Sequence, residues 1–227
     1  MAQAQAQTAQ ETVISPTESL ELVRALLRVS VYHVAYLRGL FPDQHFKGMD
    51  MANLDGMHIK MLRPKCSDSQ RLVDWIEHGV HDAIKKMFLK TLYFGIASNL
   101  EGSKLIEEYV FNFIYGDGGT VEMSLTAKGK AVNSSSQASV NSVRFQVIRL
   151  MRMLVQLCNT LDKVPDERYL FMKLAYYDHV PDDYEPPFFR SQPDCGPAHF
   201  ERRPFAMQVG NVTTNHHTVS LKLKSVL

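Results

Sequence analysis

Cysteine is scarce in this sequence, with three residues among 227, and they lie far apart at Cys66, Cys158 and Cys195. So few thiols at such spacings do not form a disulfide framework, which is typical of a reducing compartment. An excess of one charge is also missing, since 25 Lys and Arg residues face 24 Asp and Glu residues, a formal net charge of +1. This balance excludes phosphate binding through bulk charge, although a local basic patch stays compatible with it.

Long apolar runs are absent too. None approaches the roughly 20 residues that span a bilayer, so no membrane partner is predicted. Residues 1–12 consist mainly of Gln, Ala and Thr, with neither the basic start nor the apolar segment of a signal peptide, and we expect a disordered tail there. Residues 13–227 have the composition of an ordinary globular domain.

A first helix is predicted by apolar residues at steps of three and four from Leu20 onward. Ser15 suits the N-cap, Pro16 the first turn, and Glu18 closes a capping box with Ser15. Pro42 is expected to end this helix.

The same period predicts a second helix from about Ser67 to Met87 and a third over residues 140–161. Gly79 falls in the middle of the second helix, where glycine costs about 1 kcal/mol relative to alanine. This cost indicates that close packing requires a glycine at that position.

Alternation of apolar and polar residues predicts antiparallel strands rather than further helices. A glycine-rich turn at 116–119 favours a hairpin between two of these strands. Helices and strands are segregated, without alternating β-α-β units, so the sequence predicts an α+β fold with one helical layer on one antiparallel sheet. Residues 43–65 and 181–204 are expected to be irregular, and the predicted strands are 91–97, 105–115, 121–126, 169–178 and 219–224.

Catalytic and metal-binding constellations are incomplete, so no catalytic residue, metal ligand or cofactor is predicted. His78 and His81 lie one helical turn apart but lack further ligands at a suggestive spacing. Cys195 and His199, beside the acidic residues 182–185, provide half a zinc site at most. A metal-dependent enzyme built on these groups is therefore a minor alternative.

Several ordered motifs show a family resemblance that covers about residues 20–227. They resemble the HORMA domain of meiotic chromosome-axis proteins, most closely the plant asynaptic and fungal Hop families. The motifs are Leu37-Arg38-Gly39-Leu40-Phe41-Pro42, Leu72-Val73-Asp74-Trp75, Ile106-Glu107-Glu108-Tyr109, Val180-Pro181-Asp182-Asp183-Tyr184-Glu185-Pro186-Pro187-Phe188-Phe189-Arg190 and Met207-Gln208-Val209-Gly210-Asn211-Val212.

The resemblance implies a HORMA-type fold, with three long helices on the sheet, a core of about residues 13–179 and a C-terminal safety belt of about residues 180–227. Such domains add a closure-motif peptide to a sheet edge and fold the belt over it. The implied edge residues are Tyr169, Phe171, Met172, Lys173, Leu174, Ala175, Tyr176 and Tyr177. The implied belt residues are Phe188, Phe189, Phe200, Phe205, Val219, Leu221 and Leu223.

The resemblance further implies a non-enzymatic adaptor on meiotic chromosomes in the nucleus, supporting homologue pairing, synapsis and recombination. Its expected partners are closure-motif peptides of axis-core proteins or of its own family, an AAA+ remodelling ATPase that engages residues 1–12, and chromatin indirectly. An adaptor in checkpoint or DNA-repair signalling is the alternative within the fold. Proline at Ala175 is expected to remove a hydrogen-bond donor from the receiving edge.

Overall fold

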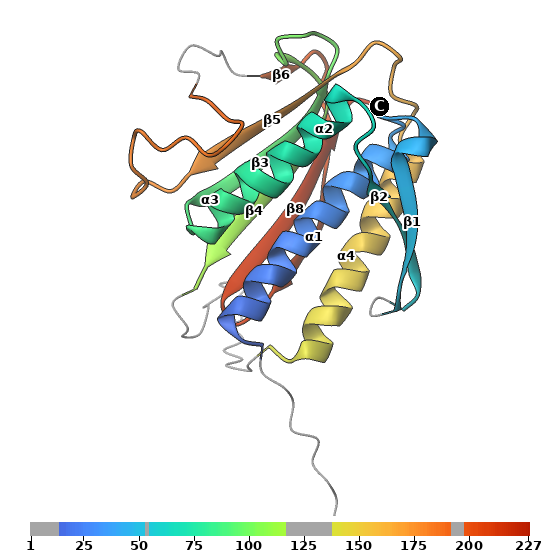
Figure 1. Ribbon diagram of the computed structural model, residues 1–227. Helices are drawn as coiled ribbons and strands as arrows, with labels where there is room; N and C mark the ends of the chain where they lie inside the picture. The colour runs from blue at the N-terminus through green and yellow to red at the C-terminus, as the bar shows by residue number, and fades with distance from the viewer. Residues whose placement is uncertain (1–13, 53–54, 117–137, 192–197) are drawn as a thin grey trace, which may run out of the picture.

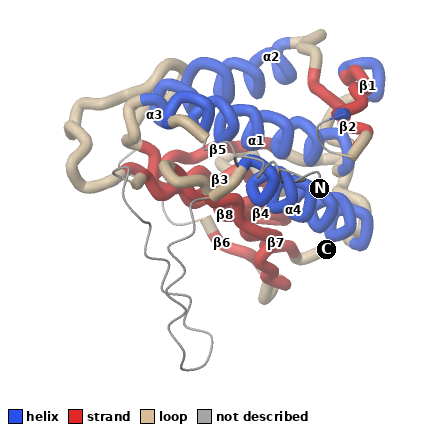
Figure 2. The backbone as a smooth tube through the Cα atoms, turned by 90° about the horizontal axis from the view of Figure 1, so that it is seen from below, coloured by secondary structure: helices blue, strands red, loops and turns tan. Residues whose placement is uncertain are grey.

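The computed structural model describes residues 14–52, 55–116, 138–191 and 198–227. Its helices form one layer and its main sheet forms a second layer beneath them (Figures 1 and 2). This arrangement confirms the predicted α+β class with three long helices on an antiparallel sheet. In the described part of the chain, no helix combines the length and apolar character needed to cross a bilayer.

Helix α1, Pro16–Leu37, begins as its sequence predicts. The Ser15 hydroxyl accepts a hydrogen bond from the Glu18 backbone N–H, and the Glu18 carboxylate accepts one from the Ser15 N–H at 2.9 Å. The predicted end at Pro42 is wrong, because the helix stops at Leu37 and Gly39 adopts a positive φ of 61°. Glycine takes this left-handed conformation without the steric cost that a side chain incurs, so it ends helices.

Residues 43–65 are more regular than expected. After the short 3-10 helix η1, Asp43–His45, strands β1, Phe46–Met51, and β2, Met57–Leu62, form an antiparallel hairpin. Neither strand shows clean alternation, because only the inner residues Ile59 and Leu62 are buried. The hairpin packs beside α1, where His33 Nδ1 accepts a hydrogen bond from the Lys60 N–H.

The second predicted helix is observed as one continuous helical stretch in three segments. α2, Ser67–Asp74, passes into the wider π-helical segment η3, Trp75–Val80, and then into α3, His81–Lys85. Gly79 lies in the π-helical segment and is buried. The third predicted helix is α4, Val140–Thr160.

The main sheet has the strand order β5-β3-β4-β8-β7, with neighbours antiparallel along this path. Its strands are β3, Leu89–Ala97; β4, Lys104–Tyr115; β5, Tyr169–Tyr176; β7, Phe205–Thr213; and β8, His217–Ser225. The two-residue strand β6, His199–Phe200, pairs in parallel with the start of β4. The strand predicted at 121–126 lies outside the described residues, and β4 itself lies between β3 and β8.

The core lies between the helices and one face of the sheet. Alternate residues of the central strands, such as Phe94, Tyr109 and Leu221, share this face and are fully buried. They meet the inner side of α1, including Leu27 and Val31, which are also fully buried. Burial of this apolar surface stabilises the layered fold.

A buried ion pair joins the two layers at one end of the molecule. The Arg38 guanidinium, just after α1, donates from Nε to the Glu107 carboxylate of β4 at 3.1 Å. It also donates to the backbone carbonyls of Cys158, at 3.0 Å, and Asp162, at 2.6 Å, at the end of α4. Both side chains are almost wholly buried, so each charge depends on the other for its solvation.

Replacing Arg38 with alanine leaves the Glu107 carboxylate buried without its counter-charge. We expect Arg38→Ala to lower the free energy of unfolding by about 3–5 kcal/mol in urea denaturation. The matched control is Arg71→Ala, which removes an exposed pair with Asp68 and is expected to cost less than about 1 kcal/mol. Equal losses in the two variants would contradict this role for Arg38.

Candidate functional site at the edge of the sheet

Strand β5 is a terminal strand of the main sheet. Among the described residues it pairs only with β3, in a register that runs from Ala97 opposite Tyr169 to Leu89 opposite Tyr176. The other long side of β5 therefore presents backbone groups without a strand partner in the described structure. Such an edge is a template for a further strand.

The hydrogen bond at the end of β5 fixes which backbone groups face this edge. The Tyr177 N–H donates to the Phe88 carbonyl at 3.1 Å, on the β3 side. Consecutive residues of a strand direct their backbone N–H and C=O groups to opposite sides. The backbone groups of Ala175, two residues before Tyr177, therefore also point toward β3. The free edge then carries the backbone groups of Leu170, Met172, Leu174 and Tyr176. The expected loss of an edge donor on placing proline at Ala175 is therefore wrong.

Side chains of β5 alternate between two faces. Met172 is buried against the core, and Leu170, Leu174 and Tyr176 pack at its margin. Phe171 lies on the opposite face, where its ring occupies the space above Gly95 of β3: a Cβ at Gly95 would lie 2.0 Å from the ring. The Lys173 ammonium lies 5.7 Å from the centre of the same ring. Tyr177, just beyond the strand, donates from its hydroxyl to the Phe113 carbonyl at 2.7 Å.

After β5 the chain re-enters the sheet at β6. This strand lies near the end where β5 begins, and on the side of β4 that faces away from β3 and β5. β5 ends beside Leu89, whereas β6 pairs with Lys104 and Leu105, next to the end where β5 begins. Residues 177–198, 22 residues, make this connection, and their extended reach of about 70 Å exceeds the roughly 26 Å length of β5. Figure 1 shows residues 177–191 looping outward from the end of β5, and β6 near its start.

The predicted belt residues lie in three parts of the chain. Phe189 packs on Trp75 of η3, and Phe188 beside it is 60% exposed. Val219, Leu221 and Leu223 of β8 are buried and pair opposite Phe113, Phe111 and Tyr109 of β4. Phe200 lies in β6, and Phe205 begins β7 with 45% of its surface exposed. Alternation alone did not predict β7, because its first four residues are exposed.

The turn between β7 and β8 is bound to the start of α1. The Ser19 hydroxyl lies 2.6 Å from Thr214 Oγ1 and 2.7 Å from His217 Nδ1, and all three residues are buried. His216 Nε2 donates to the Ile14 carbonyl at 3.2 Å. Burial and the nearby His216 lower the pKa of His217, which keeps its ring neutral at physiological pH. Two ends of the chain that are far apart in sequence are thus joined.

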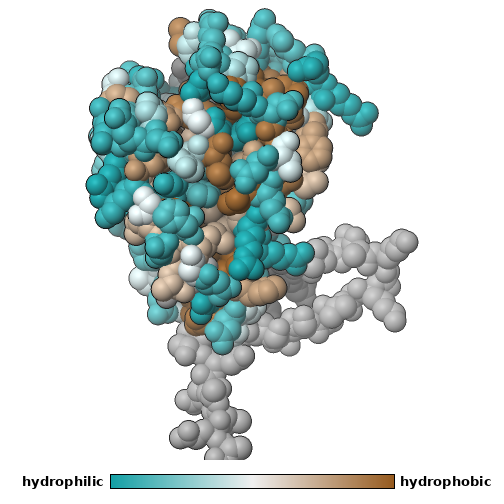
Figure 3. Space-filling model, turned by 90° about the vertical axis from the view of Figure 1, so that its right-hand side faces the viewer, coloured by the Kyte–Doolittle hydropathy of each residue, from teal (hydrophilic) through white to brown (hydrophobic). Residues whose placement is uncertain are grey.

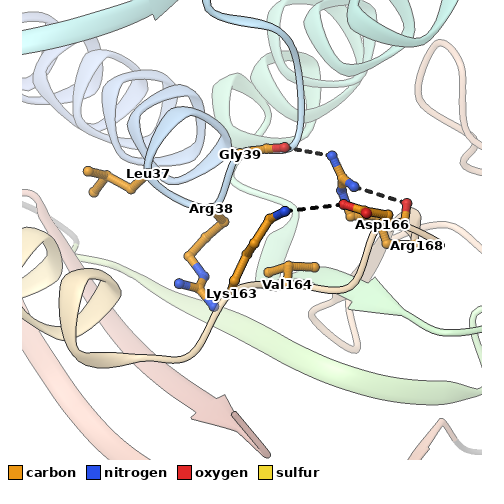
Figure 4. A pocket seen from close by; sticks show the side chains of 7 residues that line it. All are labelled: Leu37, Arg38, Gly39, Lys163, Val164, Asp166 and Arg168. Carbon is orange, nitrogen blue, oxygen red and sulfur yellow. Dashed lines mark hydrogen bonds and ion pairs between the residues drawn. The ribbon is translucent and has the colours of Figure 1, made fainter.

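A small pocket of about 280 Å³ adjoins the start of β5 (Figure 4). Arg168, immediately before β5, donates to the Gly39 carbonyl at 2.6 Å, and Lys163 lies 3.4 Å from Asp166. These contacts tie the start of the edge strand to the end of α1. The charged side chains here already have partners, so the pocket is a structural junction.

A larger apolar groove of about 660 Å³ lies between α1 and α4. Its lining includes Leu22, Val29, Val143 and Met151, and none of its lining residues belongs to the main sheet. Figure 3 shows the neighbouring side of the molecule, where apolar residues form a band among hydrophilic ones. The groove is distinct from the edge formed by β5.

The alternative metal site gains no support from the described residues, which contain no cluster of three or more His, Cys, Asp or Glu side chains suited to a metal ion. His81 is buried beside Glu77, whereas His78 points to the surface against Phe188. Cys195 lies outside the described residues.

Comparisons with known proteins agree with this architecture. The HORMA domain profile matches residues 19–217. The meiosis-specific protein ASY1 of Arabidopsis thaliana is 42% identical over 98% of this chain, and HORMA domain-containing protein 1 of Homo sapiens is 36% identical over 91%. The chain spans 38% and 51% of those two proteins.

Among solved structures, C. elegans HTP-2 bound to HTP-3 closure motif 1 superposes with a TM-score of 0.79 at 19% identity, covering 94% of this chain and 88% of that one. The fold is therefore that of a HORMA domain. With the profile match over most of its length, the chain belongs to the HORMA domain family.

The contact between Gly95 and Phe171 is testable by a double-mutant cycle. We expect Gly95→Ala to lower the free energy of unfolding by about 1–2 kcal/mol, because the new methyl group displaces the Phe171 ring. In a Phe171→Ala background the same change should be neutral or stabilising, since alanine loses less entropy than glycine on folding. Equal effects in both backgrounds would show that the ring does not cover Gly95.

Proposed function

We propose that the domain binds closure-motif peptides by adding them as a strand to the free edge of β5. The observation that carries this proposal is the combination of an unpartnered edge, within the described residues, with a chain that passes from one end of that edge to the other. Backbone hydrogen bonds to Leu170, Met172, Leu174 and Tyr176 supply affinity, and alternate side chains of the peptide provide selection.

In this proposal residues 180–227 are the safety belt and residues 13–179 the core that receives the peptide. The arrangement with β8 on β4 and β7 outermost is the closed one, because the end of the belt is fixed on the far side of the sheet. Phe171, Lys173 and Tyr177 line the exposed face of the receiving strand. A peptide held in this way leaves slowly, since its release requires local opening of the belt.

The biological setting follows from the relatives. The 42% identity to a protein named as meiosis-specific favours an adaptor of the meiotic chromosome axis in the nucleus, supporting pairing, synapsis and recombination. The HTP-2 structure contains a closure motif of another protein, so peptides of axis proteins or of this family are the partners we propose. The role is one of binding, without catalysis, and contact with chromatin is indirect.

The receiving edge is testable with Leu174→Pro. Proline removes the N–H that faces the free edge while the bonds to β3 remain, and an edge strand tolerates proline at such a position. We expect the affinity for a fluorescent peptide, selected on the wild-type chain from a random library, to fall at least about tenfold in anisotropy titrations.

Leu174→Ala is the matched control, because it loses the same side chain but keeps the N–H. It should bind close to wild-type affinity, and circular dichroism should show that both variants are folded. Wild-type affinity in a folded Leu174→Pro variant would place the peptide elsewhere.

We also propose an AAA+ remodelling ATPase as a partner that engages residues 1–12. Support comes from the bonds between the start of α1 and the β7–β8 turn, since unfolding Ile14 and Ser19 breaks the contacts to His216 and His217. Deletion of residues 1–12 should leave peptide affinity unchanged but abolish ATP-dependent peptide release by the meiotic ATPase of the same organism. Normal ATP-dependent peptide release from the truncated chain would show that the ATPase does not need residues 1–12.

A further inference from the structure

Residues 184–189, here called the clasp, dock on the helix that contains Gly79. A Cβ at Gly79 would lie 2.4 Å from the Phe189 ring and 2.5 Å from the Pro187 carbonyl oxygen, so only glycine leaves room for this segment. The Phe189 ring lies 6.4 Å from the ring of Trp75, one turn earlier on the same helix. Glycine in the middle of a helix is costly, and here it creates a notch for a side chain from the first part of the safety belt.

The other end of the clasp is held by Tyr184. Its hydroxyl donates to the Asp82 carboxylate at 2.8 Å, and its ring meets Tyr176 at 5.3 Å and Phe88 at 5.0 Å. Burial and the Asp82 carboxylate raise the pKa of the Tyr184 hydroxyl, which therefore remains a donor. Pro186 between the two anchors is buried.

The backbone conformation of the clasp directs the Phe189 ring into the notch and the Phe188 ring toward solvent. Phe188 has a positive φ of 67°, a left-handed conformation that is unfavourable for a residue with a side chain. Phe188 is 60% exposed, whereas Phe189 packs against the core. The Phe189 N–H donates to the Pro186 carbonyl at 3.1 Å, and this turn places Phe188 in the left-handed conformation while the Phe189 ring enters the notch.

The clasp can undock while the strands at the end of the chain stay paired. It lies between the end of β5 and the return of the chain to β6. The end of the safety belt is held separately, because β8 pairs with residues 107–115 of β4 and β7 pairs with β8. Undocking the clasp exposes a few partly buried rings, whereas detaching β8 breaks a full strand ladder and exposes Leu221 and Leu223. Opening the clasp is therefore the less costly local transition.

We infer that the seating of Phe189 in the Gly79 notch holds the safety belt closed and sets how long a peptide stays bound. Gly79 and Phe189 are positioning residues, since neither lies on the receiving edge. This inference rests on the proposed function, because it assigns a kinetic role to part of the belt around the β5 edge.

The docking itself is measurable without a peptide, because Trp75 is the one tryptophan in the sequence. We expect acrylamide to quench Trp75 fluorescence more efficiently in Gly79→Ala and in Phe189→Ala than in the wild type. Phe145→Ala is the matched control, since Phe145 lies on α4 and is 65% exposed. It should leave the quenching unchanged.

The kinetic role is measured with the library-selected peptide and the full chain. We expect the dissociation rate to rise about tenfold in Gly79→Ala and in Phe189→Ala, and to stay unchanged in Phe145→Ala. Circular dichroism should show that both single variants stay folded, because each loses only the docking contacts of the clasp and keeps the ladder between β4 and β8. The double variant should dissociate no faster than the faster single variant, since both changes break one contact.

The outcomes separate this inference from the proposed function. Unchanged quenching in both variants would show that the ring is not in the notch and would overturn the inference. Increased quenching with an unchanged dissociation rate would overturn the kinetic role while peptide binding stands. If the wild-type chain selects no peptide, the proposed function fails, and the kinetic role fails with it.

Discussion

The structure depends on a covalent constraint: the chain leaves the main sheet at one end of β5 and re-enters it at the other end, on the far side of β4. Because β8 and β7 occupy that far side, they leave β5 as a terminal strand. The connecting residues must then pass from one end of this edge to the other. The free edge and the segment that can enclose it are thus two consequences of one topology.

The contacts around this topology differ in strength. The strong ones stabilise the frame, and the weakest one is where local opening is expected. The buried pair of Arg38 and Glu107 joins α1, β4 and the end of α4, and it stabilises the frame that β5 belongs to. The ladder between β4 and β8 is nearly as secure, since its inner residues are fully or almost fully buried. The contact of Phe189 with the Gly79 notch involves a ring that is only partly buried. Local opening is expected where it exposes the least surface, which is at residues 184–189.

Local sequence patterns predicted much of the fold. Ser15 and Glu18 form their capping box because both partners lie within one turn, and α4 has nearly the expected bounds because its apolar stripe is long. The hairpin of β1 and β2 was missed because its short strands bury few residues. The strand partners of β4 were not predictable from alternation, which identifies a strand but not its neighbours.

The sequence by itself determined the helices, most strands, the place of β5 and the family resemblance, because periodicity, capping and ordered motifs are local features. Tertiary structure decided which side of β5 stays open and which of its backbone groups face outward. It also decided that the glycine at position 79 accommodates a ring 110 positions later in the chain. These are pairings between distant segments, and many alternative pairings are compatible with the same local patterns until the whole chain packs.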